Sequence, residues 1–254
     1  MSRLHRAAAA LAFGVLAAGS AATARAQIVG MPLFTNPRVG TGIRIHADLG
    51  QPTDKGTSIG NATVVQGGVT LALGPVGIGA NVGMTNNDFK TVTSGASSAN
   101  VGTQTKVTAS ALLQLRLMGG GLNPLSLSIF GGASFDVSAY DFANLSSLPT
   151  AIQDSIKSAN PKLLTIPAGA AIGIKLPILG LSVWGAPRMV FTKVIDCPSG
   201  ATCSTKNDFR WAAGVDLPIL GILSIRGAYD SGQIAGQTVS YWGVGASIGL
   251  GGMR

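Results

Sequence analysis

The sequence predicts an all-β fold, a closed antiparallel up-and-down β-barrel of about ten strands that spans a membrane, with eight or twelve strands as alternatives. Apolar residues alternate with small or polar ones along about ten segments, and a period of two places the two sets on opposite faces of a strand. Only 11% of the 254 residues are charged, whereas a soluble domain carries roughly 25%. Gly is abundant, with 36 residues, and no Glu occurs.

The N-terminus has the anatomy of a secretory signal peptide. Residues 1–6 form a basic head, residues 7–18 are apolar, and the tripeptide at 24–26 is a small-residue cleavage site. We expect cleavage after residue 26, so that the mature chain begins at Gln27; an uncleaved anchor is the alternative. Cleavage lowers the basic residues from 18 to 15 against 10 acidic ones, a net charge of +5.

The mature chain divides into a lead, a barrel and a tail. Residues 27–37 precede the first alternating segment and are expected to form a periplasmic lead. The alternating segments all lie within residues 38–250, the expected barrel domain, and residues 251–254 are the tail. No apolar run in the mature chain reaches the roughly 20 residues that a membrane-spanning helix needs. A membrane protein of this sequence must therefore cross as strands.

Each expected strand carries large apolar residues at every second position. The last one, YWGVGASIGL, is the clearest, because Trp242, Val244 and Ile248 alternate with Gly243 and Gly245. In chain order the ten segments fall near residues 38–48, 69–73, 76–84, 106–117, 125–136, 165–175, 181–191, 209–217, 223–230 and 241–250.

The connections between these segments alternate in length. Short turns with Gly or Pro follow the even segments, and longer polar loops follow the odd ones, so one end of the barrel is expected to carry five loops. In the loop at 140–163, residues 147–160 predict a short helix, either a loop decoration or a lid over a pore. Cys197 and Cys203 share another loop and, in an exported protein, predict a disulfide. A metal site would need more ligands, and no metal or cofactor is expected.

The period alone does not say which face points inward. With the apolar face inside, as in a soluble barrel, the exterior would be Gly, Ser, Thr and about one charge per strand, too few charges for a soluble surface. We therefore expect the apolar face to meet lipid and the small and ionic face to line the interior. Aromatic residues on the apolar face near the long-loop ends are expected to form a girdle: Phe135, Phe191, Phe209, Trp211, Tyr229 and Trp242.

Charged residues on the opposite face are expected to line the lumen. In a narrow barrel they are expected to pair with one another; if water passes between them, their basic excess favours anions. They are Arg44, Asp48, Arg116, Asp136, Lys175, Arg188, Arg210, Asp216, Arg226 and Asp230.

With its export signal, even strand number, short turns and longer loops, the chain resembles the small, porin-like outer-membrane β-barrel proteins of Gram-negative bacteria. The resemblance covers roughly Pro37 to Leu250. It implies an integral outer-membrane protein with periplasmic termini and extracellular long loops, surrounded by lipid and lipopolysaccharide. Periplasmic chaperones and the barrel assembly machinery are its implied partners during biogenesis. The final strand of this group usually ends in an aromatic residue, whereas this chain ends GLGGMR.

A barrel architecture does not determine an activity, so two functions remain as alternatives. One is a structural barrel whose loops bind a surface ligand, and the other is a narrow, weakly anion-preferring channel for small anionic solutes. No enzyme is expected, with one alternative: an outer-membrane hydrolase in which Asp48 orients His46 as a base. The resemblance to ten-stranded outer-membrane proteases stops there, because their paired aspartates have no counterpart. No basic run with interleaved aromatics occurs, so nucleic acid is not an expected partner.

Overall fold

The protein is seen in a computed structural model. It describes residues 31–38, 41–53, 63–89, 92–94, 97–99, 102–120, 123–138, 150, 162–177, 180–195, 204–219, 222–234 and 237–250. The signal peptide expected at 1–26, nearly all of the helix expected in the loop at 140–163, both cysteines and the tail at 251–254 lie outside the described residues.

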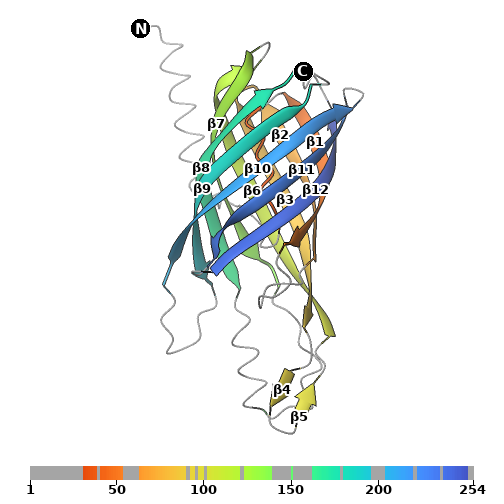
Figure 1. Cartoon of the computed structure of the whole chain (residues 1–254), viewed down its shortest axis with the longest axis vertical. Coiled ribbons are helices and arrows are strands. Elements are labelled where there is room, and N and C mark those ends of the chain that lie inside the picture. The colour runs from red at the N-terminus through yellow and green to blue at the C-terminus, as the bar shows by residue number, and fades with distance from the viewer. Residues whose placement is uncertain are drawn as a thin grey trace, which may run out of the picture.

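Ten strands close into one antiparallel barrel, which confirms the predicted fold class (Figure 1). Each strand pairs with its neighbours along the chain, and β1 pairs with β12 to close the ring, in register from Ile43↔Leu250 to Pro52↔Tyr241. A small separate hairpin, β4 (Val92–Ser94) and β5 (Ser97–Ala99), lies between β3 and β6 in the chain. The barrel strands are β1 (Gly42–Pro52), β2 (Thr63–Leu73), β3 (Val76–Phe89), β6 (Gly102–Gly120), β7 (Asn123–Asp136), β8 (Leu163–Lys175), β9 (Ser182–Val194), β10 (Lys206–Ile219), β11 (Leu223–Ile234) and β12 (Gln237–Leu250).

The two ends of the barrel differ in their connections, as expected. At one end, called the short-turn end, β2 and β3 are joined at Gly74, whose positive φ of 65° suits the tight turn. At the same end the β6–β7 pairing shifts register next to Gly119, where φ is 94° and a Cβ would lie 2.4 Å from the Leu125 carbonyl oxygen. At the other end, the loop end, four connections are long, at 53–62, 90–101, 137–162 and 195–205.

The fifth connection at the loop end is shorter than expected. Only residues 235 and 236 separate β11 from β12. Ile234, the last residue of β11, pairs with Gln237, the first residue of β12. The β11–β12 ladder thus continues to the very end of the hairpin, because the polar residues Ser231, Gln233 and Thr238 extend the strands beyond the apolar alternation. This end of the barrel therefore has four long connections and one connection of two residues.

The apolar face of the barrel points outward. Among the described residues, Ile45 is 51% exposed and Val82 is 57% exposed, while Arg210 and Asp230 on the inner face are fully buried. Soluble proteins bury their apolar side chains and expose their charges, so this inverted arrangement fits a lipid exterior. No helix in the described part of the chain is long and apolar enough to cross a membrane.

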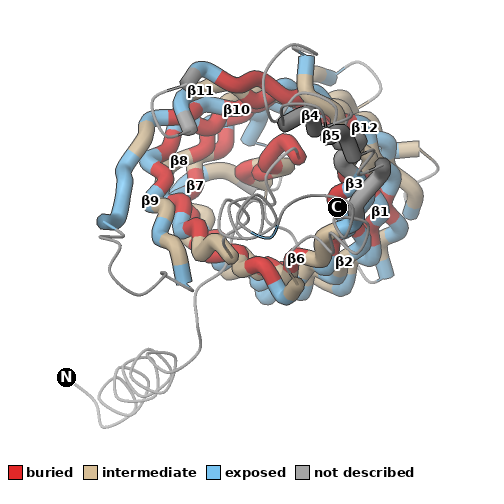
Figure 2. The backbone as a smooth tube through the Cα atoms, turned by 90° about the horizontal axis from the view of Figure 1, so that it is seen from below, coloured by how far each residue is buried: buried red, intermediate tan, exposed pale blue. Residues whose placement is uncertain are grey.

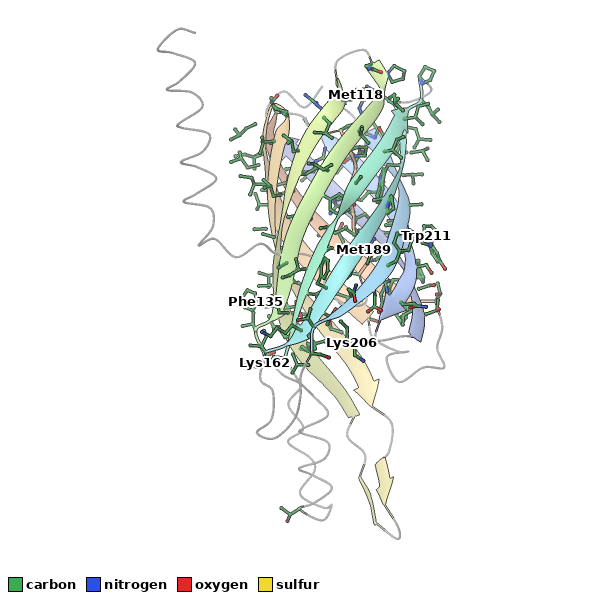
Figure 3. All side chains as sticks on the ribbon, turned by 90° about the vertical axis from the view of Figure 1, so that its left-hand side faces the viewer. Met118, Phe135, Lys162, Met189, Lys206 and Trp211 are labelled. Carbon is green, nitrogen blue, oxygen red and sulfur yellow. The ribbon has the colours of Figure 1, made fainter. Side chains whose placement is uncertain are left out.

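The aromatic residues expected in the girdle lie on the outer surface towards the loop end. Trp211 points away from the barrel (Figure 3) and its ring centroid lies 5.6 Å from that of Tyr229. Phe135 is only partly exposed, whereas the other members are exposed: Phe191, Phe209, Trp211, Tyr229 and Trp242. A tilted aromatic pair on the lipid face is an arrangement favoured at membrane interfaces.

Candidate lumenal site

A stretch of chain lies inside the ring of strands (Figure 2), and the contacts below identify it as residues 31–38, called the N-terminal segment. Of the periplasmic lead expected at residues 27–37, the described part, residues 31–37, thus lies within the lumen. The backbone N–H of Leu33 donates to Asp230 Oδ2 at 3.2 Å. Asn36 Nδ2 donates to Asp216 Oδ2 at 2.9 Å, and Gln114 Nε2 donates to the Asn36 carbonyl oxygen at 2.8 Å. These contacts fix the segment to the inner faces of β6, β10 and β11.

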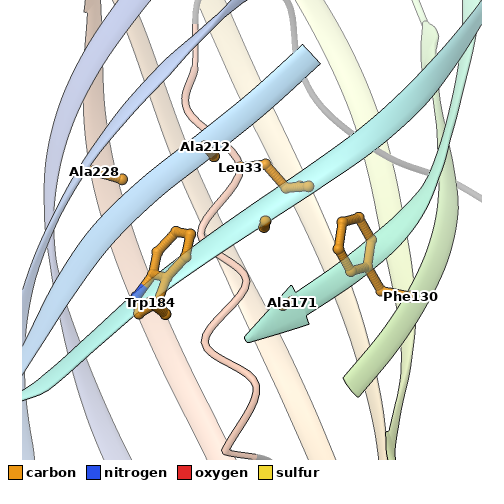
Figure 4. Packing of buried hydrophobic residues seen from close by; sticks show 7 residues of the cluster. Leu33, Phe130, Ala171, Trp184, Ala212 and Ala228 are labelled. Atoms are coloured by element: carbon orange, nitrogen blue, oxygen red, sulfur yellow. The ribbon is translucent and has the colours of Figure 1, made fainter. Parts of the chain in front are cut away.

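Apolar contacts hold the N-terminal segment against one wall of the lumen. Leu33 packs in a buried cluster with two large side chains, Phe130 and Trp184, and with small ones from β8 to β11 (Figure 4). The small members of this cluster are Ala171, Ala186, Ala212 and Ala228. Small side chains on this wall leave the volume that the segment occupies, which is the physical reason why it sits inside.

Two glycines, one on β8 and one on β12, come still closer to the N-terminal segment. A Cβ on Gly173 would lie 2.7 Å from Cγ of Pro37, and a Cβ on Gly243 would lie 2.9 Å from Cδ of Pro32. Real Cβ atoms do not approach carbon atoms so closely, so any larger residue at either position must displace the segment.

The N-terminal segment runs along the lumen from the loop end towards the short-turn end. Met31 is buried against Val64, the second residue of β2 at the loop end. At the other end of the segment, Arg38 Nη1 donates to the carbonyl oxygens of Asn123 and Pro124, where β7 begins. Partial burial, and secondly the charge of Arg116, lower the pKa of the Arg38 guanidinium. The chain then turns into β1 at Gly42.

Asp230 binds two arginines in the part of the lumen nearer the loop end. Arg210 donates from Nη2 to Asp230 Oδ1 at 2.8 Å and from Nε to the same oxygen at 3.1 Å. Arg188 Nη2 donates to Oδ2 of the same carboxylate. All three side chains are enclosed, with exposed fractions of 2% or less. Two buried guanidinium groups therefore share one carboxylate, which also accepts a hydrogen bond from the Leu33 backbone N–H.

Asp48 forms a second buried ion pair, with Arg226. The pair is bidentate, from Arg226 Nε to Oδ1 at 2.7 Å and from Nη2 to Oδ2 at 2.6 Å, and Gln66 Nε2 donates to Oδ2 at 2.9 Å. The Arg226 guanidinium lies 4.5 Å above the ring of Phe34 in the N-terminal segment. A cation over an aromatic face is attracted by the ring, so this pair also contacts the segment.

The two remaining predicted aspartates are buried and bound by donors. Asp136 forms an ion pair with Lys106, which the list of expected lumenal charges omitted although it lies on the inward face of its strand, and accepts from Thr108 Oγ1 at 3.0 Å. Asp216 Oδ2 accepts from Trp184 Nε1 at 2.7 Å in addition to Asn36.

Three basic residues of the predicted lumenal set remain to be placed: Arg44, Arg116 and Lys175. Arg44 lines the cavity described below, and Arg116 is half-buried on β6. Lys175 differs from the expectation: it is exposed, because it is the last residue of β8 and the inward face ends there.

His46 and Asp48 share the inner face of β1 but are not hydrogen-bonded to each other. His46 Nε2 lies 3.9 Å from Asp48 Oδ2, beyond hydrogen-bond range, and 2.7 Å from Asn81 Oδ1. The Asp48 carboxylate is engaged by Arg226 and Gln66 instead. His46 is thus oriented by an amide, not by a carboxylate. No group of three or more metal-binding side chains occurs in the described part of the chain.

A cavity of about 100 Å³, with both polar and apolar walls, remains on the opposite side of the N-terminal segment. Its walls come from the segment, from β1, β2, β3 and β6, and from two residues of β10 and β11. Its charged lining residues are Arg38, Arg44, Arg226 and Asp216, and its polar ones include Asn36, His46, Gln66, Thr70, Asn81, Ser110 and Gln114. A partly polar cavity of this size has room for a few water molecules.

No family model matches this chain, and no curated protein sequence matches it. Among solved structures, the translocator domain of the autotransporter NalP from Neisseria meningitidis is 14% identical, with 82% of this chain and 88% of that chain covered and a TM-score of 0.41. Ail of Yersinia pestis in a phospholipid bilayer nanodisc is 9% identical, with 83% and 99% covered and a TM-score of 0.38. The N-terminal β-barrel domain of OprF from Pseudomonas aeruginosa is 8% identical, with 83% and 99% covered and a TM-score of 0.34.

Likenesses this distant carry no argument about function, so the classification rests on the barrel itself. Closure leaves no unpaired strand edge, the outer face is apolar and the inner face is charged. In a bilayer every backbone polar group must be paired, and a closed barrel with an apolar exterior meets that requirement. The chain is a closed ten-stranded antiparallel β-barrel whose apolar outer face fits a lipid bilayer.

Proposed function

We propose that this protein is a closed barrel that acts through its surface loops and does not conduct solutes in its resting state. The observation that supports the proposal is the N-terminal segment in the lumen, held by Asp216 and Asp230 and by the apolar cluster around Leu33. With the loop end outside the cell, the four long loops are the part of the chain that can meet lipopolysaccharide or a surface ligand.

The contacts of the N-terminal segment with buried charges support a closed lumen for an energetic reason. Opening a path along the axis would require moving the segment away from Asp230 and from the Arg226 guanidinium, both of which are buried. Asp230 would lose the hydrogen bond from the Leu33 N–H, worth about 1.5–3 kcal/mol, and Arg226 would lose its contact with the Phe34 ring, worth about 0.5–2 kcal/mol. The resting barrel should therefore keep the segment in place.

Planar-bilayer recording tests the closed state. The mature chain, residues 27–254, should insert and stay silent. A variant in which residues 31–37 are replaced by a Gly-Ser sequence of equal length should show discrete conductance steps, because the lumen loses its filling while the chain keeps its length. Equal conductance of both proteins would overturn the proposal.

Binding to lipopolysaccharide micelles tests the role of the loops. Deleting residues 141–160 leaves β7 and β8 intact, together with the bond from the Leu163 backbone N–H to Asp136 Oδ2 at 2.9 Å. The barrel should fold, as judged by heat-modifiable mobility in gels, and lose its binding. A folded variant that binds as well as the full chain would remove this loop from the proposal.

The cavity favours a second candidate, a gated channel that prefers anions. Three arginines and one aspartate line the space between the N-terminal segment and β1, β2, β3 and β6. If the segment shifts transiently, this basic wall would favour anions. The full-length chain should then show brief openings with anion preference, and Arg44→Ser should reduce that preference. Complete silence over the accessible voltage range would exclude this candidate.

A further inference from the structure

We propose that the barrel holds its own N-terminal chain across the membrane and displays the polypeptide that precedes Met31 on the side of the long loops. The last strand, β12, ends at Leu250 at the short-turn end, so the two ends of the chain would lie on opposite sides of the membrane. The resemblance to outer-membrane barrels implies instead that both lie on one side. The inference rests on the N-terminal segment in the lumen, as the proposed function does, and adds the direction in which that segment runs.

The first residues of the N-terminal segment contact the part of the lumen near the loop end. Met31 is buried against Val64, the second residue of β2, which begins at the loop end. The Leu33 backbone N–H donates to Asp230 at 3.2 Å, and Asp230 lies four residues before the end of β11 at the loop end.

The last residues of the segment contact the opposite end. Pro37 packs against Gly173, two residues before β8 ends at the short-turn end, where a Cβ would lie 2.7 Å from the proline Cγ. Arg38 Nη1 donates at 3.2 Å to the carbonyl oxygen of Asn123, the first residue of β7. The segment therefore crosses the lumen once, and its N-terminal end points to the loop end.

The composition of the segment suits a chain that crosses without a strand partner. Pro32 and Pro37 have no backbone N–H, so neither adds a buried donor that needs an acceptor. The Leu33 N–H is bound by an acidic side chain of β11, and the Arg38 N–H donates to Asn36 Oδ1 at 3.0 Å. The segment thus meets the hydrogen-bond needs of a buried backbone through side chains, which lets it lie inside the barrel as a single stretch.

The lumen beside the start of the segment leaves no path back to the short-turn end. Arg188, Arg210 and Tyr241 are enclosed there, with exposed fractions of 2% or less, and both arginines bind the carboxylate that holds Leu33. On the other side, the cavity of about 100 Å³ has room for a few water molecules but not for a returning chain. A returning backbone would also need partners for its own N–H and C=O groups. The polypeptide before Met31 must therefore leave at the loop end.

Protease accessibility in intact cells tests this direction. Three variants of the full chain carry the same short epitope with a protease site, inserted after Gln27, after Gly56 in the long connection between β1 and β2, or after Arg254. They are expressed in a Gram-negative host and treated with a protease that does not cross the outer membrane. The Gly56 epitope marks the side of the loops, and the Arg254 epitope is the matched control on the side where the last strand ends.

The epitope after Gln27 should be cleaved under the same conditions as the Gly56 epitope, whereas the Arg254 epitope should differ from both. With the loops outside, the first two are cleaved in intact cells and the third only after permeabilisation. An epitope after Gln27 that behaves like the one after Arg254 would overturn the inference. Together with a silent barrel in planar-bilayer recording, that result would remove the direction of the segment and leave the closed lumen standing.

A second variant covers a failure to fold, which heat-modifiable mobility in gels detects. If the epitope after Gln27 prevents barrel formation, Gln27→Cys takes its place in a chain that also carries Cys197→Ser and Cys203→Ser. A maleimide that does not cross the outer membrane should label this cysteine in intact cells whenever the Gly56 epitope is accessible there. Labelling only under the conditions that expose the Arg254 epitope would again overturn the inference.

Discussion

Replacing Asp230 by Asn should destabilise the barrel more than any other single lumenal change we consider. The carboxylate accepts from Arg210 through Oδ1, and from Arg188 and the Leu33 backbone through Oδ2. An amide keeps the shape but removes the charge, and its NH₂ group would point a donor at one of these donors. Two enclosed guanidinium groups would then lack their shared counter-ion.

The expected magnitude follows from the burial of the three side chains. Breaking a buried ion pair by removing one partner costs about 3–5 kcal/mol, and exposed fractions of 2% or less place this group at the buried extreme. Arg188→Met is the matched comparison, because it leaves Asp230 paired one-to-one with Arg210 and still bonded to the Leu33 N–H. No buried charge of the cluster then lacks its counter-ion, so we expect a loss well below that of Asp230→Asn.

Urea unfolding in lipid vesicles, followed by tryptophan fluorescence, measures both free energies of unfolding. Heat-modifiable mobility in gels verifies that each variant forms a barrel before unfolding. The reasoning would be refuted if Asp230→Asn and Arg188→Met lost the same stability, because the cost would then come from packing and not from an unbalanced buried charge.

Three further outcomes follow from the same geometry. Brominated lipid chains should quench a variant whose only tryptophan is Trp211, which is 42% exposed, but not one that keeps only Trp184, which is 3% exposed; equal quenching would contradict the orientation of the faces. Gly173→Val should displace Pro37 and speed proteolysis within residues 31–38, whereas in the control Gly185→Ala the new Cβ meets only the Ala212 carbonyl oxygen, at 3.9 Å; identical digestion would place the segment elsewhere. Trp184→Phe removes the indole donor to Asp216 and should cost about 1.5–3 kcal/mol in urea unfolding, and an unchanged midpoint would mean that the bond contributes nothing.

The ten strands could be predicted because the two faces of each strand meet different media. On β12 the exposed Trp242, Val244 and Ile248 alternate with inward positions, as the sequence pattern indicates. Strand length was less predictable. β2 begins at Thr63, six residues before the expected Val69, because Gly67 and Gly68 interrupt the apolar alternation without ending the strand pairing.

The N-terminal segment could not be predicted by the same method, since it has no period and its contacts join distant parts of the chain. Leu33 and Asp230 are 197 residues apart, and Asn36 and Asp216 are 180 apart. One signal was present in the sequence: the inward positions of four neighbouring strands include Ala171, Ala186, Ala212 and Ala228, too small to fill a lumen by themselves.

For the lumenal charges, the period of two indicates the face but not the partner. His46 and Asp48 are two residues apart on one strand, yet Asp48 binds Arg226, 178 residues away, because the bidentate fork of an arginine satisfies both oxygens of a buried carboxylate. Partner choice depends on barrel closure, which brings β1 and β11 to the two sides of β12. Adjacent residues on one strand are therefore poor predictors of lumenal pairs.

The two walls of the lumen explain why alanines and arginines occur together on the inner face. One wall, from β8 to β11, is lined with small side chains where the N-terminal segment packs. The facing wall, from β1, β2, β3 and β6, keeps longer polar side chains such as Gln66, Asn81 and Gln114, and the segment does not fill the space before them. A barrel with a uniform inner face would be either fully packed or open. The asymmetry leaves the described segment packed against one wall and a cavity of about 100 Å³ between it and the other.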